Sequence, residues 1–311
     1  MVTSDASHHG ANAMPDVIFE EIECKSAINR VSNNGRMLPF RWTLNPYRGC
    51  QHACTYCFAR GTHEYLGYDA GRDFETRVIV KKNAPEMLRQ DLSRPAWRRE
   101  TIAIGTACDP YQAAELKYSL THRLLKALRD YANPATITTK SPHIIRDADV
   151  IEELSRVAEF TVNFSIATLD EEIWKRIEPS TSKPQKRLEA MRLLADRGIR
   201  CGVLLAPVLP GLTDDPDGLE QVVAAAKEHG ASFISDNVLY LKPGTKEWFM
   251  PFLREAYPHL SERYAQYYRG AFAPRTYTQD VHRVVERLRL KYDLVAPRRE
   301  QPAAGQLELA M

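Results

Sequence analysis

The 311-residue sequence has no uninterrupted apolar stretch of about 18 residues, the length that a membrane-spanning helix needs. It also lacks a strong charge of either sign, with 42 Lys and Arg against 40 Asp and Glu. The first residues, 1–16, have neither a basic start nor an apolar core, so they do not resemble a secretory signal. These absences predict a soluble, cytoplasmic protein with no membrane partner. The net charge of +2 neither favours nor excludes a nucleic-acid partner.

Cysteine is scarce, and its few positions are unevenly spread. The six are Cys24, Cys50, Cys54, Cys57, Cys108 and Cys201. Disulfides rarely persist in a reducing compartment, so the close spacing of Cys50, Cys54 and Cys57 needs another explanation. Cys24 and Cys201 carry no spacing signal, and we interpret them as structural thiols.

Three closely spaced thiolates predict a metal site. Soft sulfur ligands select zinc, Cu(I) or an iron–sulfur cluster. A structural zinc normally takes four ligands, and His52 or His63 is the candidate for the fourth. No second Cys or His pair follows to complete such a site. Three cysteines around a four-iron cluster would leave one iron open for a small chelating cofactor.

The chain alternates apolar, β-rich runs with helical patterns. Most runs are apolar over much of their length, which favours a parallel sheet covered on both faces. The expected strands lie within 40–49, 101–107, 135–140, 160–167, 201–207 and 231–240. The expected helices lie within 121–131, 147–160, 183–198 and 215–230. Asp147 is the predicted N-cap of the second helix, and Gly198 and Gly230 end the last two.

This pattern predicts an α/β fold, a partial (β/α)6 TIM-type barrel with a helical C-terminal extension. An eight-stranded barrel is the alternative, but residues 241–311 supply no two further strands. We divide the chain into four parts: a loose leader and N-terminal extension (1–39), a core (40–240), a helical extension (241–295) and a flexible tail (296–311). Within 62–100 we expect an extra strand in 74–82 and a helix in 83–94.

The segment NPYRGCQHACTYCFAR resembles the cluster loop of radical S-adenosylmethionine (SAM) enzymes, whose pattern is Cys-x3-Cys-x-aromatic-Cys. Tyr56 occupies the aromatic position. More narrowly, the chain resembles the spore photoproduct lyase-like group, also called DNA repair photolyases. The supporting segments occur in the usual order of the group: 45–50, 105–115, 139–141, 146–150, 177–191 and 207–215.

The resemblance implies that Cys50, Cys54 and Cys57 hold a [4Fe–4S] cluster. It also implies that SAM binds the open iron and is cleaved to a radical that abstracts hydrogen from a substrate. An electron donor such as flavodoxin or ferredoxin would then be a partner. The alternative is a non-enzymatic iron–sulfur binding or sensing protein that uses the same cysteines.

Polar residues at the expected strand ends are the candidates for holding SAM. They are Thr106, Asp109, Lys140, Ser141, Asn163 and Ser165, in addition to Tyr56. Each has a structural alternative: a turn at Asp109–Pro110, a solvated Lys140, and a buried Asn163 and Ser165 satisfied by backbone groups. Arg176 and Glu178 either line the cavity or form a solvated pair.

Cys108 is a candidate hydrogen donor that the resemblance does not directly support. Spore photoproduct lyases use a cysteine near this strand end, but the aligned position here is Thr106. Two positions along a strand or turn need not face the same pocket. The alternative for Cys108 is a buried, inert thiol.

The sequence predicts no single substrate. Repair of DNA lesions is the activity that the resemblance suggests, and modification of RNA or a protein is the alternative. Residues 241–311 mix basic and aromatic side chains: Lys242, Lys246, Arg254, Arg263, Arg269 and Arg275 with Trp248, Tyr257, Tyr264, Tyr267, Tyr268 and Tyr277. Such a mixture binds single-stranded nucleic acid in some proteins, but aromatics at helical spacing more often pack against a core.

Overall fold

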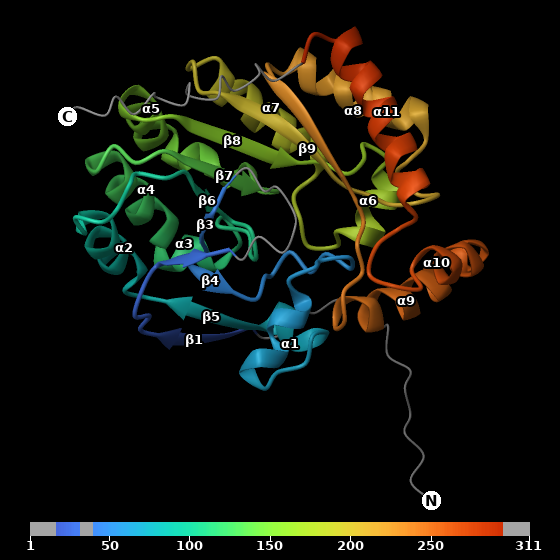
Figure 1. Cartoon of the computed structure of the whole chain (residues 1–311), viewed down its shortest axis with the longest axis horizontal. Coiled ribbons are helices and arrows are strands. Elements are labelled where there is room, and N and C mark those ends of the chain that lie inside the picture. Colours follow the sequence, from blue (N-terminus) through green and yellow to red (C-terminus); the bar gives the residue numbers. More distant parts are fainter. Residues whose placement is uncertain (1–16, 32–39, 295–311) are drawn as a thin grey trace, which may run out of the picture.

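A seven-stranded sheet forms the centre of the computed structural model, which describes residues 17–31 and 40–294 (Figure 1). Its order is β10-β9-β8-β7-β6-β3-β2, and all neighbouring pairs are parallel except β2 with β3. The strands are β2 (Ile28–Arg30), β3 (Trp42–Leu44), β6 (Ile102–Ile104), β7 (Ala135–Thr139), β8 (Phe160–Ser165), β9 (Cys201–Val208) and β10 (Phe233–Val238). The six predicted strands are therefore the six parallel ones. Because β10 does not pair with β2, the sheet is a partial barrel, as predicted.

Helices follow the strands and bury apolar faces against the sheet. The longer ones are α2 (Ala84–Ser93), α4 (Leu120–Asp130), α5 (Ala148–Val157), α7 (Pro184–Ala195) and α8 (Pro216–Glu228). Short ones are α1 (Arg72–Thr76), α3 (Ala114–Tyr118), α6 (Glu171–Ile177) and the 3-10 turns Arg60–Thr62, Glu64–Leu66, Pro142–Asp147 and Pro258–Leu260. All six residues of β8 are buried, which explains why its sequence does not alternate.

The predicted N-cap residue of α5 is confirmed, but it does not cap the helix with its side chain. Asp147 occupies the N-cap position of α5, but its side chain makes no capping hydrogen bond. Its carboxylate instead accepts from the Tyr111 hydroxyl at 2.9 Å and lies 2.9 Å from His122 Nδ1. By contrast, Asp215 does cap α8, accepting from the Gly218 N–H at 2.9 Å. Tertiary partners thus outcompete the local cap at Asp147.

The segment 40–49 contributes to two sheets rather than one. After β3, strand β4 (Tyr47–Arg48) joins a small sheet of order β1-β5-β4, drawn below the large sheet in Figure 1. The predicted strand in 74–82 is β5 (Arg77–Lys81), and the predicted helix in 83–94 is α2. The predicted N-terminal extension supplies β1 (Ile18–Ile22) and β2. The predicted leader 1–16 and tail 296–311 lie outside the described residues.

The C-terminal region is helical, as predicted, with α9 (Thr245–Ala256), α10 (Ser261–Tyr267) and α11 (Arg275–Lys291). Tyr264 and Tyr268 are fully buried and stack with ring centroids 5.5 Å apart. These two rings therefore pack the helices, which is what the core interpretation predicts. Within the described ranges, no helix is long and apolar enough to cross a membrane.

Candidate active site

The three clustered cysteines lie on one tight loop after β4. Gly49 has φ of +82°, and a Cβ there would lie 2.7 Å from the Arg77 carbonyl oxygen. Ala53, between the first two cysteines, also has a positive φ, 53°, which is unusual for a residue with a side chain. These two positions make tight bends in the loop. Cys50 and Cys54 are buried and Cys57 is half-buried.

The loop chemistry fits a cluster. Burial raises the pKa of all three thiols, and it raises that of Cys54 to about 12. Metal binding must therefore displace their protons. The backbone N–H of Asp109 points to Cys50 Sγ at 3.5 Å, a contact of the kind that tunes cluster sulfurs.

A single metal ion fits less well. Among residues 17–31 and 40–294, no three His, Cys, Asp or Glu side chains converge on a position for one ion. Cluster ligands bind separate irons, so they need not converge in that way. His63, one candidate fourth zinc ligand, lies with its Nε2 2.9 Å from the Arg77 carbonyl oxygen. His52, the other, has Nδ1 3.3 Å from an Asp109 oxygen.

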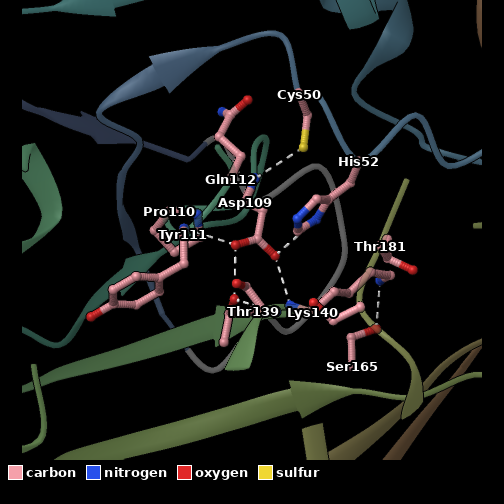
Figure 2. Close-up of polar contacts among 12 residues, drawn as sticks. Cys50, His52, Asp109, Pro110, Tyr111, Gln112, Thr139, Lys140, Ser165 and Thr181 are labelled. Atoms are coloured by element: carbon pink, nitrogen blue, oxygen red, sulfur yellow. Dashed lines mark hydrogen bonds and ion pairs between the residues drawn. The ribbon is translucent and has the colours of Figure 1, made fainter. Parts of the chain in front are cut away.

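Asp109 joins the end of β6 to the end of β7. Figure 2 shows its carboxylate between His52, Tyr111, Thr139 and Lys140. It accepts from the Thr139 hydroxyl at 2.8 Å and from the Lys140 backbone N–H at 2.6 Å. Burial alone would raise the pKa of Asp109, but His52 and these donors outweigh it and lower that pKa to about 2. Both oxygens are therefore committed to protein donors.

Lys140 points into a second buried polar group. Its Nζ donates to Ser165 Oγ at 2.7 Å and lies 3.8 Å from Glu178 Oε1 (Figure 2 shows the first contact). The same Nζ lies 5.8 Å from the centre of the Tyr56 ring, whose hydroxyl donates to Glu178. The structure thus brings together three predicted cofactor residues, Tyr56, Lys140 and Ser165.

Glu178 is the anion of that group. Arg187 is fully buried and its Nη2 lies 2.6 Å from Glu178 Oε2. Burial opposes ionisation, yet the charges of Arg187 and Lys140 outweigh it and lower the pKa of Glu178. Arg176, the other residue of the expected pair, is exposed and donates to the Ala256 carbonyl, so the two residues do not pair with each other.

The other predicted residues have protein partners away from this group. Thr106 accepts from Asn45 Nδ2 at 3.1 Å. Ser141 caps the 3-10 turn by accepting from the His143 N–H. Asn163 donates to Thr136 Oγ1 at 2.6 Å and to the Ile137 carbonyl at 3.1 Å, so it is satisfied by β7.

Cys108 has the surroundings of an inert thiol. It is buried in an apolar cluster with Tyr47, Val80 and Leu120. Its Sγ lies 3.9 Å from Asn45 Oδ1, and burial raises the pKa of the thiol to about 12. Its role as a hydrogen donor stays a prediction.

Comparison with known proteins places this geometry in a family. The model of the Radical SAM superfamily matches residues 44–223, more than half of the chain, including all three cysteines of the loop. This chain belongs to the radical SAM superfamily. Enzymes of this superfamily use a [4Fe–4S] cluster and SAM.

Relatives of this radical SAM protein occur in bacteria and archaea. An uncharacterized protein of Mycobacterium tuberculosis is 42% identical over 296 residues, covering 95% of this chain and 86% of the relative. An uncharacterized protein of Methanocaldococcus jannaschii is 27% identical over 242 residues, covering 78% and 85%. A structure of a spore photoproduct lyase mutant with bound AdoMet and dinucleoside spore photoproduct matches with a TM-score of 0.65, 13% identity and coverage of 93% and 86%. That likeness confirms the fold that the sequence predicts.

Sequence reasoning missed the residues that hold the radical SAM cysteine loop in place. Gln112 donates to the Gly49 carbonyl at 3.2 Å, and Thr245 donates to the Cys57 carbonyl at 3.0 Å. Arg60 donates to the Cys54 carbonyl through two nitrogens. Arg60 and Gln112 carried a weak signal, because Arg60 lies in the cluster segment and Gln112 lies in the supporting segment 105–115. Thr245 is 188 residues from its partner, and no spacing pattern reports that contact.

Proposed function

We propose that Cys50, Cys54 and Cys57 bind a [4Fe–4S] cluster and that the chain is an enzyme that cleaves SAM reductively. The observation that carries the proposal is the loop itself. It holds three free thiols, two of them buried and one half-buried, and the Asp109 N–H is directed at the thiol of Cys50. When bound, the cluster supplies the electron that breaks the sulfonium–C5′ bond of SAM, giving a 5′-deoxyadenosyl radical that abstracts hydrogen from a substrate.

Lys140 is the proposed contact for the carboxylate of SAM. Ser165 is proposed to orient the Lys140 ammonium, because its hydroxyl accepts from Lys140 Nζ and donates its own hydrogen to the Ala206 carbonyl. Lys140 carries a positive charge at the end of β7, and its ion-pair distance to Glu178 is long, 3.8 Å. An incoming carboxylate would gain a charge-assisted hydrogen bond from Lys140 without uncovering Glu178, because Arg187 still holds that anion at 2.6 Å. Tyr56 fixes Glu178 from the cysteine loop and offers its ring beside the Lys140 ammonium.

Four further residues are proposed to support this cofactor site through contacts with other protein groups: Thr106, Asp109, Ser141 and Asn163. Asp109 would fix the Lys140 backbone through its N–H, and Ser141 would cap the 3-10 turn that follows. Thr106 would hold Asn45, and Asn163 would hold β7 at Thr136. An electron donor such as flavodoxin or ferredoxin is the proposed partner, and the cytoplasm, where such carriers operate, is the proposed location.

Loss of the cluster in cysteine variants tests the proposal. Anaerobic reconstitution of the wild type should yield about four iron and four sulfide per chain. Cys50→Ala, Cys54→Ala and Cys57→Ala should each lose the cluster, whereas Cys201→Ala, which changes a buried thiol in β9, should keep it. Stoichiometric zinc with no iron uptake in the wild type would contradict the proposal and support the zinc alternative.

For the substrate we propose nucleic acid, on the basis of an aromatic row beside the cysteine loop. Phe58 follows Cys57 and is 42% exposed, and its ring lies 5.4 Å from that of Tyr240. Tyr240 lies 5.9 Å from Phe272, which is 47% exposed, and Lys242 Nζ lies 5.8 Å from the Tyr240 ring. Exposed rings stack on unpaired bases, and a nearby cation attracts phosphate.

Binding measurements test this substrate class. The loaded protein with SAM should bind single-stranded oligonucleotides at low ionic strength, with an affinity that falls as salt rises. Phe272→Ala should weaken binding about 5-fold or more, because stacking contributes about 1–3 kcal/mol per base. Leu290→Ala, at an exposed apolar position on α11, is the control and should not change the affinity. No salt-dependent affinity for single- or double-stranded DNA or RNA would favour a protein substrate.

A further inference from the structure

A fully buried arginine holds the middle of the cysteine loop. Arg60 donates to the Cys54 carbonyl through Nε at 3.1 Å and through Nη2 at 2.9 Å. Its Nη1 donates to the carbonyl oxygens of Gly71 at 2.9 Å and Ala70 at 3.3 Å. Its Nη2 also forms an ion pair with Glu75. Every nitrogen of the guanidinium therefore has a partner, although the side chain has no exposed surface.

The helical C-terminal region completes this arrangement. The Trp248 ring lies 4.8 Å from the Arg60 guanidinium carbon, and the Phe74 ring lies 5.3 Å from it. Trp248 also packs against Gly71, where a Cβ would come within 2.5 Å of its ring. Thr245, one turn earlier on α9, holds the Cys57 carbonyl.

The two chain segments also touch through their backbones. A Cβ on Gly61 would lie 2.7 Å from the Pro243 carbonyl oxygen, and a Cβ on Gly244 would lie 2.7 Å from Gly61 Cα. Gly244 has φ of +80°, so glycine is favoured there for two reasons. The carbonyls of two successive loop cysteines are thus fixed, one by Arg60 and one by α9.

We propose that Arg60 is a positioning residue for the cluster loop and that the Arg60–Glu75 pair sets the reduction potential of the cluster, an inference that rests on the proposed function. Reduction adds one negative charge to the cluster. A cation near the cluster stabilises the reduced form and an anion destabilises it. Arg60 is fully buried and Glu75 is partly buried, so solvent screens their charges only weakly. Removing Glu75 charge should raise the potential, and removing Arg60 charge should lower it.

The two charge variants should shift the reduction potential in opposite directions, which a purely structural role of Arg60 and Glu75 would not produce. Wild type, Glu75→Gln and Arg60→Gln would be reconstituted anaerobically, and the midpoint potential followed by EPR during a redox titration. We expect a positive shift for Glu75→Gln and a negative shift for Arg60→Gln. Glu153→Gln, which removes an exposed partner of Arg129, is the control and should not shift.

Two further variants test positioning without relying on Arg60→Gln retaining its cluster. Arg60→Lys keeps the charge but loses the two-nitrogen contact with Cys54, so it should release iron to a chelator several-fold faster than wild type. Thr245→Val, which removes only the hydrogen bond to the Cys57 carbonyl, should also release iron faster while keeping the wild-type potential.

An unchanged potential in Glu75→Gln, or shifts of the same sign in both charge variants, overturns the electrostatic part of the inference. Iron release at the wild-type rate from Arg60→Lys and Thr245→Val overturns the positioning part. If the wild type takes up no cluster, the proposed function itself is overturned. If the wild type is loaded but the potentials of the variants equal that of the wild type, only this inference is overturned.

Discussion

Two buried carboxylates lie near Lys140, one at its backbone N–H and one at its side-chain ammonium. They differ in the groups that hold them. Asp109 accepts from the Lys140 backbone N–H and from the backbone N–H of Tyr111. Glu178 lies near the Lys140 ammonium and is held by the side chains of Arg187 and Tyr56. Backbone donors cannot rotate away, whereas a lysine side chain can exchange one carboxylate for another. The contacts of Asp109 are therefore fixed. The Lys140 ammonium, which donates to Ser165 and lies 3.8 Å from Glu178, can turn toward a ligand by rotation of its side chain.

The largest expected effect is on stability, at Asp109. Asp109→Ala leaves the buried donors of Thr139, Lys140 and Tyr111 without their acceptor. We expect the free energy of unfolding of the metal-free protein to fall by about 3 kcal/mol, measured by urea denaturation. Asp149→Ala, which removes an exposed partner of Arg197, should change it by less than about 0.5 kcal/mol. Equal losses of unfolding free energy in both variants would contradict the fixed role given to Asp109.

At the Lys140 ammonium we expect a smaller effect on stability but a large effect on cofactor binding. Lys140→Met leaves Glu178 paired with Arg187, so unfolding should change by less than about 1 kcal/mol. Affinity of the loaded protein for SAM should fall about 10- to 100-fold, because a hydrogen bond to a charged group is lost. Calorimetric titration measures this, with Lys186→Met as an exposed control. Unchanged SAM affinity would remove Lys140 from the cofactor site.

Ser165→Ala should give the smallest effect. The Ser165 hydroxyl accepts from Lys140 Nζ at 2.7 Å and donates to the Ala206 carbonyl at 2.8 Å, so it orients the ammonium. Losing a neutral hydroxyl contact should weaken SAM binding about 2- to 10-fold in the same titration. A loss larger than that of Lys140→Met would mean that Ser165, rather than Lys140, makes the main contact.

The sequence predicts the large sheet well because buried parallel strands are recognisable as apolar runs. Of the small sheet it predicts only the middle strand, β5. The other two strands have no clear pattern, because β4 has only two residues and β1 is partly exposed. Cys50, Cys54 and Cys57 were found because their ligand spacing is local. The partnership of Lys140 with Glu178 was not, because it depends on how β7 and α6 are placed in three dimensions.

Single residues show the same limit. Asp147 has the sequence of a helix cap, but a tyrosine and a histidine brought in by the fold take its oxygens. The sequence favours Tyr264 and Tyr268 as core residues but leaves a stacking role open, and only their burial in the structure decides between the two roles. Local pattern thus predicts strands and ligands, whereas long-range packing decides what each polar or aromatic side chain does.

Product analysis tests the central claim most directly. The reconstituted wild-type protein would be incubated anaerobically with SAM and dithionite, beside Cys54→Ala, and the products separated by chromatography. The account predicts 5′-deoxyadenosine from the wild type and none from the variant. A wild type that carries about four iron per chain but releases no 5′-deoxyadenosine with dithionite or with reduced flavodoxin would contradict it and support an iron–sulfur sensor instead.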